Sequence, residues 1–249
     1  MIVHVLLFIS AFLAGIINSI AGGGSFLTFP ALVFAGVPAV AANATSTVAM
    51  LPSAFASTLS YRGDLQRLKG EPLAIWLLIS LVGGVLGSLL LLSTSESAFR
   101  EIVPWLLSLA TVLFAFGNRI SDALRGALHH SQLLLSLLLF PIAVYGGYFG
   151  GGGGIMVLAA FRLYGLSDIH AMNGIKTLVI GTLNTLAAVI FIAAHKVHWV
   201  PALLMMGAGI LGGYLGPVIA RRLSPALVRQ IVVVVGTLMT AWFFYISPR

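Results

Sequence analysis

Two polar clusters interrupt apolar stretches of this sequence, and their residue types suit the binding of a small anion. Hydroxyl and amide groups donate directional hydrogen bonds, and an ammonium group adds positive charge. The first cluster has no charge and the second contains one lysine. The members are Asn43, Thr45, Ser46 and Thr47 in the first cluster, and Asn173, Lys176 and Thr177 in the second.

Lys176 is the one charged residue of the two clusters, and it lies near the predicted start of an apolar span. An ammonium inside a membrane is costly unless something pairs with it. No acid lies deep in a predicted span, since all six are in or beside predicted loops: Asp64, Glu71, Glu96, Glu101, Asp122 and Asp168. A substrate anion is therefore the predicted partner of Lys176, and a cation transporter is disfavoured. The alternative is a lysine that reaches from the helix end to the membrane surface.

Two glycine runs, residues 22–24 and 150–154, precede the clusters. A glycine break inside a membrane protein is tolerated where it is packed in protein or lines a polar cavity, and the helix that follows presents free N–H groups. Neither run is followed by the Gly-Lys-Ser/Thr of a nucleotide loop. The predicted binding residues from the runs are Gly23, Gly24, Ser25, Gly152, Gly153 and Gly154. Close helix packing is the alternative, and we favour it for a second set: Gly83, Gly84, Gly87, Gly212, Gly213 and Gly216.

Other polar residues within the predicted spans leave two interpretations open. Asn18 and Asn184 either face the cavity or form a hydrogen bond between helices. His195 and His198, beside Lys196, are interpreted as anchors at the membrane surface, with proton coupling as the alternative. The sequence has no zinc-ligand spacing, no Ser/His/Asp set and no pair of carboxylates, so we predict no enzyme activity, no metal and no cofactor.

Composition places these residues in a membrane protein. The 249 residues are 59% hydrophobic and 8% charged, with a mean hydropathy of +1.09, and the first charge is Arg62. Soluble domains carry about 25% charged residues, so a water-soluble enzyme, a disordered chain and a nucleic-acid binder are excluded. Loops rich in Lys and Arg on the cytoplasmic side explain the net charge of +7.

The predicted fold class is an all-α, polytopic membrane helical bundle. Two shorter apolar stretches, 25–41 and 154–168, each follow a glycine run and are broken by Pro or Gly. Eight uncharged runs are long enough to span a bilayer, which needs about 20 residues. They are 2–20, 43–61, 72–92, 102–118, 131–149, 177–194, 199–219 and 230–247.

The chain repeats at an offset of about 129 residues, which predicts two tandem halves, 1–125 and 126–249. The matched segments are Gly22–Gly24 with Gly151–Gly153, Asn43–Thr47 with Asn173–Thr177, Gly83–Gly87 with Gly212–Gly216, and Arg100–Val103 with Arg229–Val232.

Loop charges indicate how the halves are oriented. If both broken stretches also cross, one side collects nine basic residues, and the other has Arg100, Lys196 and Arg249. That split obeys the positive-inside rule and predicts an inverted repeat of five crossings per half, with both termini outside. The nine are Arg62, Arg67, Lys69, Arg119, Arg125, Arg162, Arg221, Arg222 and Arg229.

These motifs resemble the TauE/SafE family of sulfite and organosulfonate exporters. The resemblance rests on AGIINSIAGGGSFLTFPALVFAGVP and its echo GGYFGGGGGIMVLAAFRLYG, each followed by a polar helix. It implies a secondary transporter that moves a small sulfur-containing anion across the bacterial inner membrane, by alternating access and with protons as a candidate coupling ion. It places the site on the residues named above. Many members of the family carry a lysine in the polar cluster of the first half, whereas in this chain the lysine, Lys176, lies in the second half. A passive anion channel, a membrane-embedded enzyme and a structural subunit of a membrane complex remain the alternatives, and the oligomeric state stays open.

Overall fold

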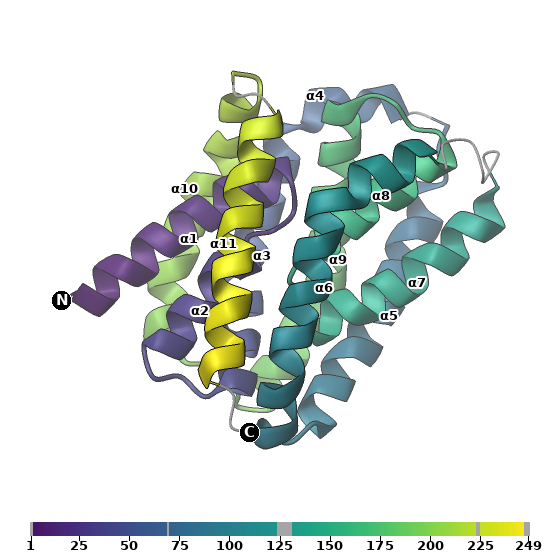
Figure 1. Cartoon of the computed structure of the whole chain (residues 1–249). Helices are drawn as coiled ribbons and strands as arrows, with labels where there is room; N and C mark the ends of the chain where they lie inside the picture. Colours follow the sequence, from purple (N-terminus) through teal and green to yellow (C-terminus); the bar gives the residue numbers. More distant parts are fainter. Residues whose placement is uncertain (1, 69, 124–130, 223–224, 247–249) are drawn as a thin grey trace.

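The computed structural model describes residues 2–68, 70–123, 131–222 and 225–246, which form eleven α-helices, one short 3-10 turn and no strand (Figure 1). Within these ranges, only the backbone is described for residues 118–123, 220, 225, 226, 228, 229 and 246. The helices are α1 (Ile2–Ile20), α2 (Ser25–Phe34), α3 (Ala39–Ser60), α4 (Arg62–Leu65), α5 (Leu73–Ser93), α6 (Glu96–Ala123), α7 (Gln132–Tyr148), α8 (Gly153–Tyr164), α9 (Ile169–Ala193), α10 (Trp199–Ala220) and α11 (Pro225–Ile246). The 3-10 turn η1 covers Gln66–Leu68.

Five helices in the described chain are long and apolar enough to cross a membrane: α1, α5, α6, α9 and α10. The prediction of an all-helical membrane bundle is thus confirmed, but only five of the eight predicted spans meet this criterion. The apolar lengths of α7 and α11, Gln132–Tyr148 and Gln230–Tyr245, are shorter than 18 residues. The third exception, α3, has 22 residues, but its polar cluster lowers its hydropathy.

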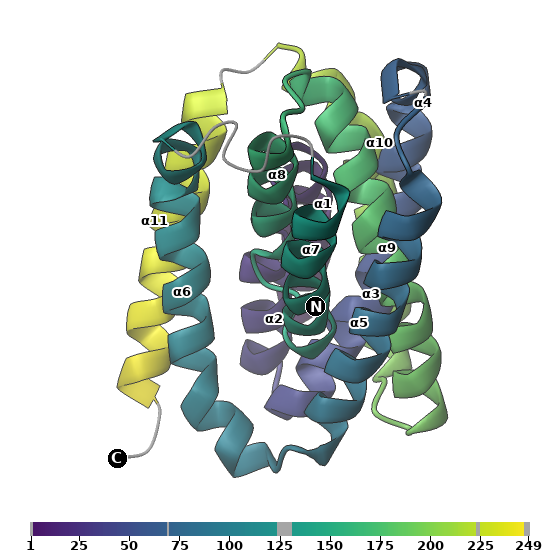
Figure 2. The same cartoon turned by 90° about the vertical axis from the view of Figure 1, so that its right-hand side faces the viewer.

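The two predicted broken stretches are the return arms of helical hairpins. Helix α7 runs in the same direction as α5, because Gly83 lies against Phe140 and Gly87 lies against Tyr148. Helix α8 then returns to the start of α5, where Phe161 packs on Trp76 with ring centroids 5.0 Å apart. The α1–α2 hairpin is built in the same way. Its first arm, α1, packs on α10, and its second arm, α2, returns toward the opposite end of the bundle from α8 (Figure 2).

A left-handed glycine makes each hairpin turn. The N–H of Gly22 (φ +86°) donates to Ile17 O at 3.1 Å, and the N–H of Gly150 (φ +76°) donates to Tyr145 O at 3.4 Å. This is the usual way to end a helix with glycine. By geometry the counterpart of Gly22 is therefore Gly150, one residue before Gly151, which the sequence repeat matched to it.

Glycines also set how closely the long helices pack. Gly83 and Gly87 of α5 lie directly against α7, and Gly84 lies against Leu183 of α9. Gly212 and Gly216 of α10 lie directly against α1. These contacts agree with the packing role favoured for this set. Large apolar side chains instead face outward from the bundle, among them Leu78, Trp105, Leu137 and Leu203, as a lipid-facing surface requires.

Helices α3 and α9 begin earlier than predicted, at Ala39 and Ile169 rather than at 43 and 177. Carboxylates cap both starts. Glu96 accepts hydrogen bonds from the N–H groups of Ala39 and Val40, the latter at 3.0 Å. Asp168 accepts from His170 N at 3.0 Å and Ala171 N at 3.2 Å. The polar clusters consequently lie one to two turns inside their helices and not at the helix starts.

Most described basic residues gather at one end of the bundle, where α3 and α10 end and α9 begins. This basic end carries Arg62, Arg67, Arg162, Arg221 and Arg222, and the opposite end carries Arg100 and Lys196. Lys69, Arg125 and Arg249, which also enter the predicted charge split, lie outside the described residues, and the side chains of Arg119 and Arg229 are not described.

Candidate functional site

The two glycine runs meet in the interior. A Cβ atom added to Gly22 would lie 2.5 Å from Gly154 Cα, and one added to Gly154 would lie 2.6 Å from Gly22 Cα. No side chain separates the two backbones, so the hairpin turns are in direct contact. The first residues of α2 and α8 therefore converge on one place in the protein.

The starts of α2 and α8 have no side-chain caps. Their N-cap residues are Gly24 and Gly152, and at neither helix start does a side chain accept a hydrogen bond from the first N–H groups. In contrast, α9 is capped by Asp168 and α7 by Ser131. Carbonyls of the glycine turns accept from several of the first N–H groups, such as Gly23 O from Phe26 N at 3.1 Å, whereas Ser25 N and Gly154 N have no backbone acceptor among the described residues. The first N–H groups of a helix need an acceptor, and the positive end of the helix dipole favours an anion. Two uncapped starts that converge therefore suit a negatively charged ligand.

A small polar cavity lies between these two helix starts. Its volume is about 20 Å³, which is room for about one water molecule. Five side chains offer hydroxyl or amide groups to it, and Asn184 Oδ1 is buried without a hydrogen-bond partner. A ligand larger than water therefore requires this cavity to widen. The lining residues are Asn18, Gly24, Ser25, Ser46, Thr47, Met50, Gly150, Gly154, Ile180 and Asn184.

Five of the thirteen predicted site residues line the cavity: Gly24, Ser25, Ser46, Thr47 and Gly154. Asn18 and Asn184, for which two roles were open, also line it. Gly150, Met50 and Ile180 were missed. The two apolar side chains carry no signal in the sequence, because they lie in apolar helices.

The other predicted residues do not line the cavity and contact neighbouring segments instead. Asn43 donates to Tyr148 O at 2.9 Å, at the end of α7. Thr45 accepts from His198 N at 3.0 Å, and Thr177 accepts from Thr58 Oγ1 at 3.0 Å. Three glycines make backbone contacts instead, namely Gly23 beside Phe114, Gly152 beside Ala110, and Gly153 beside Gly146.

Lys176 is fully buried two turns inside α9 and does not reach a membrane surface. Its Nζ donates to Asn18 O at 2.8 Å, to Ser19 O at 2.9 Å and to Asn173 Oδ1 at 3.0 Å. These three acceptors use all three of its N–H donors. The ammonium thus caps the negative end of α1, and its alkyl chain passes close to Gly154.

No group of three or more metal-binding side chains occurs among the described residues. Within the same residues, no carboxylate contacts Lys176. The positive charge beside the cavity is therefore balanced by carbonyl dipoles and not by an acid.

Comparison with known proteins identifies the family of the chain. The family model described as "Sulfite exporter TauE/SafE" matches residues 7–243. The chain is 31% identical over 244 residues to a "Probable membrane transporter protein" of Haemophilus influenzae, covering 96% of this chain and 94% of that protein. It is 29% identical over 243 residues to the "Probable membrane transporter protein YfcA" of Escherichia coli, covering 97% and 89%. The predicted resemblance and the prediction that the protein is not an enzyme are confirmed. The chain is a multi-pass membrane protein that belongs to the TauE/SafE family of membrane transporters.

Proposed function

We propose that the protein is a secondary transporter that exports a small sulfur-containing oxyanion, such as sulfite or an organosulfonate, across the bacterial inner membrane. The observation that carries this proposal is the convergence of two uncapped helix starts on a polar cavity. Donors surround the cavity, and a buried ammonium lies next to it. This set of groups suits an anion and offers no carboxylate to a cation.

In this account the substrate lies between Ser25 and Gly154. The N–H groups of Ser25 and Gly154 and the hydroxyls of Ser25 and Ser46 bind its oxygens. Asn184 adds an amide. The charge of Lys176 acts through space, because its donors are engaged with α1 and Asn173.

We further propose that residues 1–125 and 126–249 are inverted repeats that move against each other. Exchanged packing supports this idea, since α1 lies on α10 while its counterpart α7 lies on α5. The α1–α2 and α7–α8 hairpins each return to the side of the membrane from which they enter, so a hairpin has the same effect on topology as two crossings. Each half then has an odd net number of crossings, the basic end faces the cytoplasm, and both termini face outward.

A passive channel on the same scaffold is the second candidate, and a transport assay separates the two. In proteoliposomes with an imposed proton gradient, we expect sulfite to accumulate above its equilibrium concentration, since a carrier couples two gradients. Dissipation of an existing sulfite gradient without any uphill movement would assign a channel. Protein-free liposomes are the control, and no sulfite flux above theirs would contradict both candidates.

A further inference from the structure

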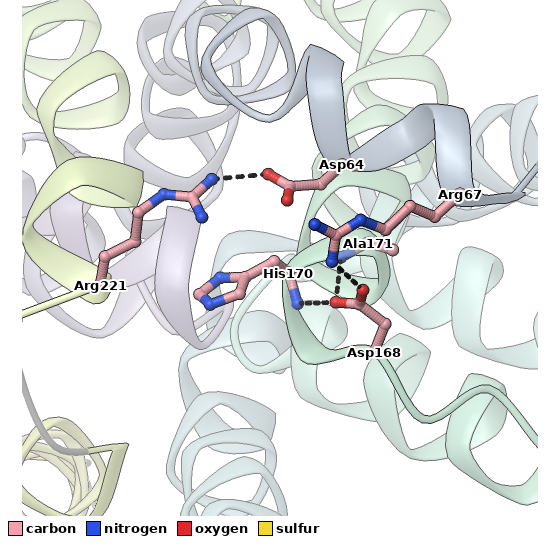
Figure 3. A network of polar contacts seen from close by, with 6 residues as sticks. All are labelled: Asp64, Arg67, Asp168, His170, Ala171 and Arg221. Atoms are coloured by element: carbon pink, nitrogen blue, oxygen red, sulfur yellow. Dashed lines mark hydrogen bonds and ion pairs between the residues drawn. The ribbon is translucent and has the colours of Figure 1, made fainter.

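Two ion pairs join the two halves of the chain, residues 1–125 and 126–249, at the basic end. Arg67 Nη1 lies 2.5 Å from Asp168 Oδ2, and Arg221 Nη2 lies 2.6 Å from Asp64 Oδ2 (Figure 3). Asp64 and Arg67 follow α3, whereas Asp168 and Arg221 flank α9 and α10. If the two halves move apart at this end to open the cavity, these ion pairs must separate.

The opposite end lacks such a connection in the part of the chain that the structure describes. Its ion pair, Arg100 with Glu96, lies within α6 at 3.3 Å. The contacts there between the two halves are neutral, such as the hydrogen bond from His198 N to Thr45. Among the described residues, the ion pairs between the two halves therefore lie at the basic end.

His170 lies within this ionic network. Figure 3 shows its ring on the Arg221 side of the network, while its backbone N–H donates to Asp168. Its Nδ1 is buried without a hydrogen-bond partner, and so is the hydroxyl of Tyr61, whose ring centroid is 6.4 Å from that of His170. The titratable and charged groups around it are Tyr61 directly after α3, Asp64 from α4, Arg67 from η1, Asp168 before its own helix and Arg221 directly after α10.

A positive charge on His170 would act against the closed arrangement. It would lie in the first turn of α9, at the positive end of the helix dipole, with Nδ1 buried and lacking an acceptor. Separation of the ion pairs would admit water to the ring. The Arg67 guanidinium, helped by the backbone N–H groups of His170 and Ala171, holds the pKa of Asp168 below its usual range, so that this carboxylate stays charged in mild acid.

We propose that this cluster is a proton-linked gate, in which binding of a proton to His170 is coupled to separation of the Asp64–Arg221 and Arg67–Asp168 pairs and to opening of the cavity toward the basic end. The proposal rests on the alternating-access function proposed above. It adds a proton site on a chain that has no carboxylate at its cavity.

The chain contains no cysteine, so spin labels can be placed at Gly63→Cys and Arg222→Cys, two exposed positions on either side of the Asp64–Arg221 pair. We expect pulsed electron paramagnetic resonance in nanodiscs to give one short distance at about pH 8. A longer distance should grow several-fold toward about pH 5, the range in which imidazole titrates. His170→Gln should remove this pH dependence, and Asp64→Asn should give the longer distance at both pH values.

His198→Gln is the matched control, since it removes a histidine at the opposite end and should leave the pH dependence intact. An unchanged pH response in His170→Gln would overturn the proton site. A single short distance in every sample, Asp64→Asn included, would overturn the gate. Because no substrate is present, these outcomes are separate from a failure of sulfite transport.

Discussion

Replacing Gly154 by alanine is expected to disrupt the junction of the two hairpins and to abolish anion binding. The added Cβ would lie 2.6 Å from Gly22 Cα, and this obstacle is backbone, which cannot rotate away as a side chain can. Overpacking of a buried site costs about 1–3 kcal/mol, and we expect the upper end of that range. The measurements are the melting temperature of the purified protein and its equilibrium binding of sulfite.

Gly153→Ala is the matched control for this substitution. A Cβ there meets Gly146 Cα at 3.7 Å and Ile180 Cδ1 at 3.8 Å, which are ordinary contacts. Alanine also favours a helix by about 1 kcal/mol over glycine. We expect Gly153→Ala to keep wild-type stability and binding. Equal behaviour of the two variants would contradict the close approach of the hairpin turns.

Replacing Lys176 by methionine is expected to lower both stability and anion affinity. Methionine has a similar length but donates nothing to Asn18 O, Ser19 O and Asn173 Oδ1. Each buried group left without a partner costs about 1–3 kcal/mol. The lost charge would weaken attraction to an anion by about 2 kcal/mol at roughly 8 Å and an effective dielectric constant near 20, which is about a 30-fold loss of affinity.

Two further variants separate these effects of Lys176. Lys176→Gln keeps one amide donor for the end of α1 without the charge, so stability should recover in part while affinity stays low. Lys196→Met removes an exposed lysine at the opposite end and should change neither property. Wild-type sulfite affinity in Lys176→Met, with reduced stability alone, would assign the lysine a purely structural role.

The membrane bundle and its family could be predicted from the sequence because they depend on local signals. Apolar runs mark spans, and the glycine runs mark turns inside the protein. The same local logic misplaced the starts of α3 and α9. It treated polar residues as signs of a helix end, whereas Lys176 is satisfied by carbonyls from α1, 157 and 158 residues away in the chain. Such a tertiary partner is not visible in a single sequence.

The cavity was predicted in part for a related reason. Ser25 directly follows a glycine run and Ser46 and Thr47 belong to the first polar cluster, and all three line it. Thr45 lies next to Ser46 in the chain, but a helix turns about 100° per residue, and Thr45 therefore contacts the α9–α10 loop instead. Which residues of a helical cluster face inward depends on the packing of α3 against its neighbours.

The central claim is that a small oxyanion binds between the starts of α2 and α8, and equilibrium binding of radiolabelled sulfite tests it most directly. Sulfoacetate, sulfate and acetate serve as competitors. Asn184→Ala is the informative variant, because Asn184 lines the cavity and its Oδ1 has no protein partner to lose. Thr185→Ala, which removes a hydroxyl bonded to Gly181 O of its own helix, is the control.

We expect one saturable site per chain, wild-type affinity in Thr185→Ala, and an affinity about tenfold lower in Asn184→Ala, as for loss of one hydrogen bond to a charged group. The account would be contradicted by the absence of saturable binding for all four anions, or by equal affinities in the wild-type protein and Asn184→Ala.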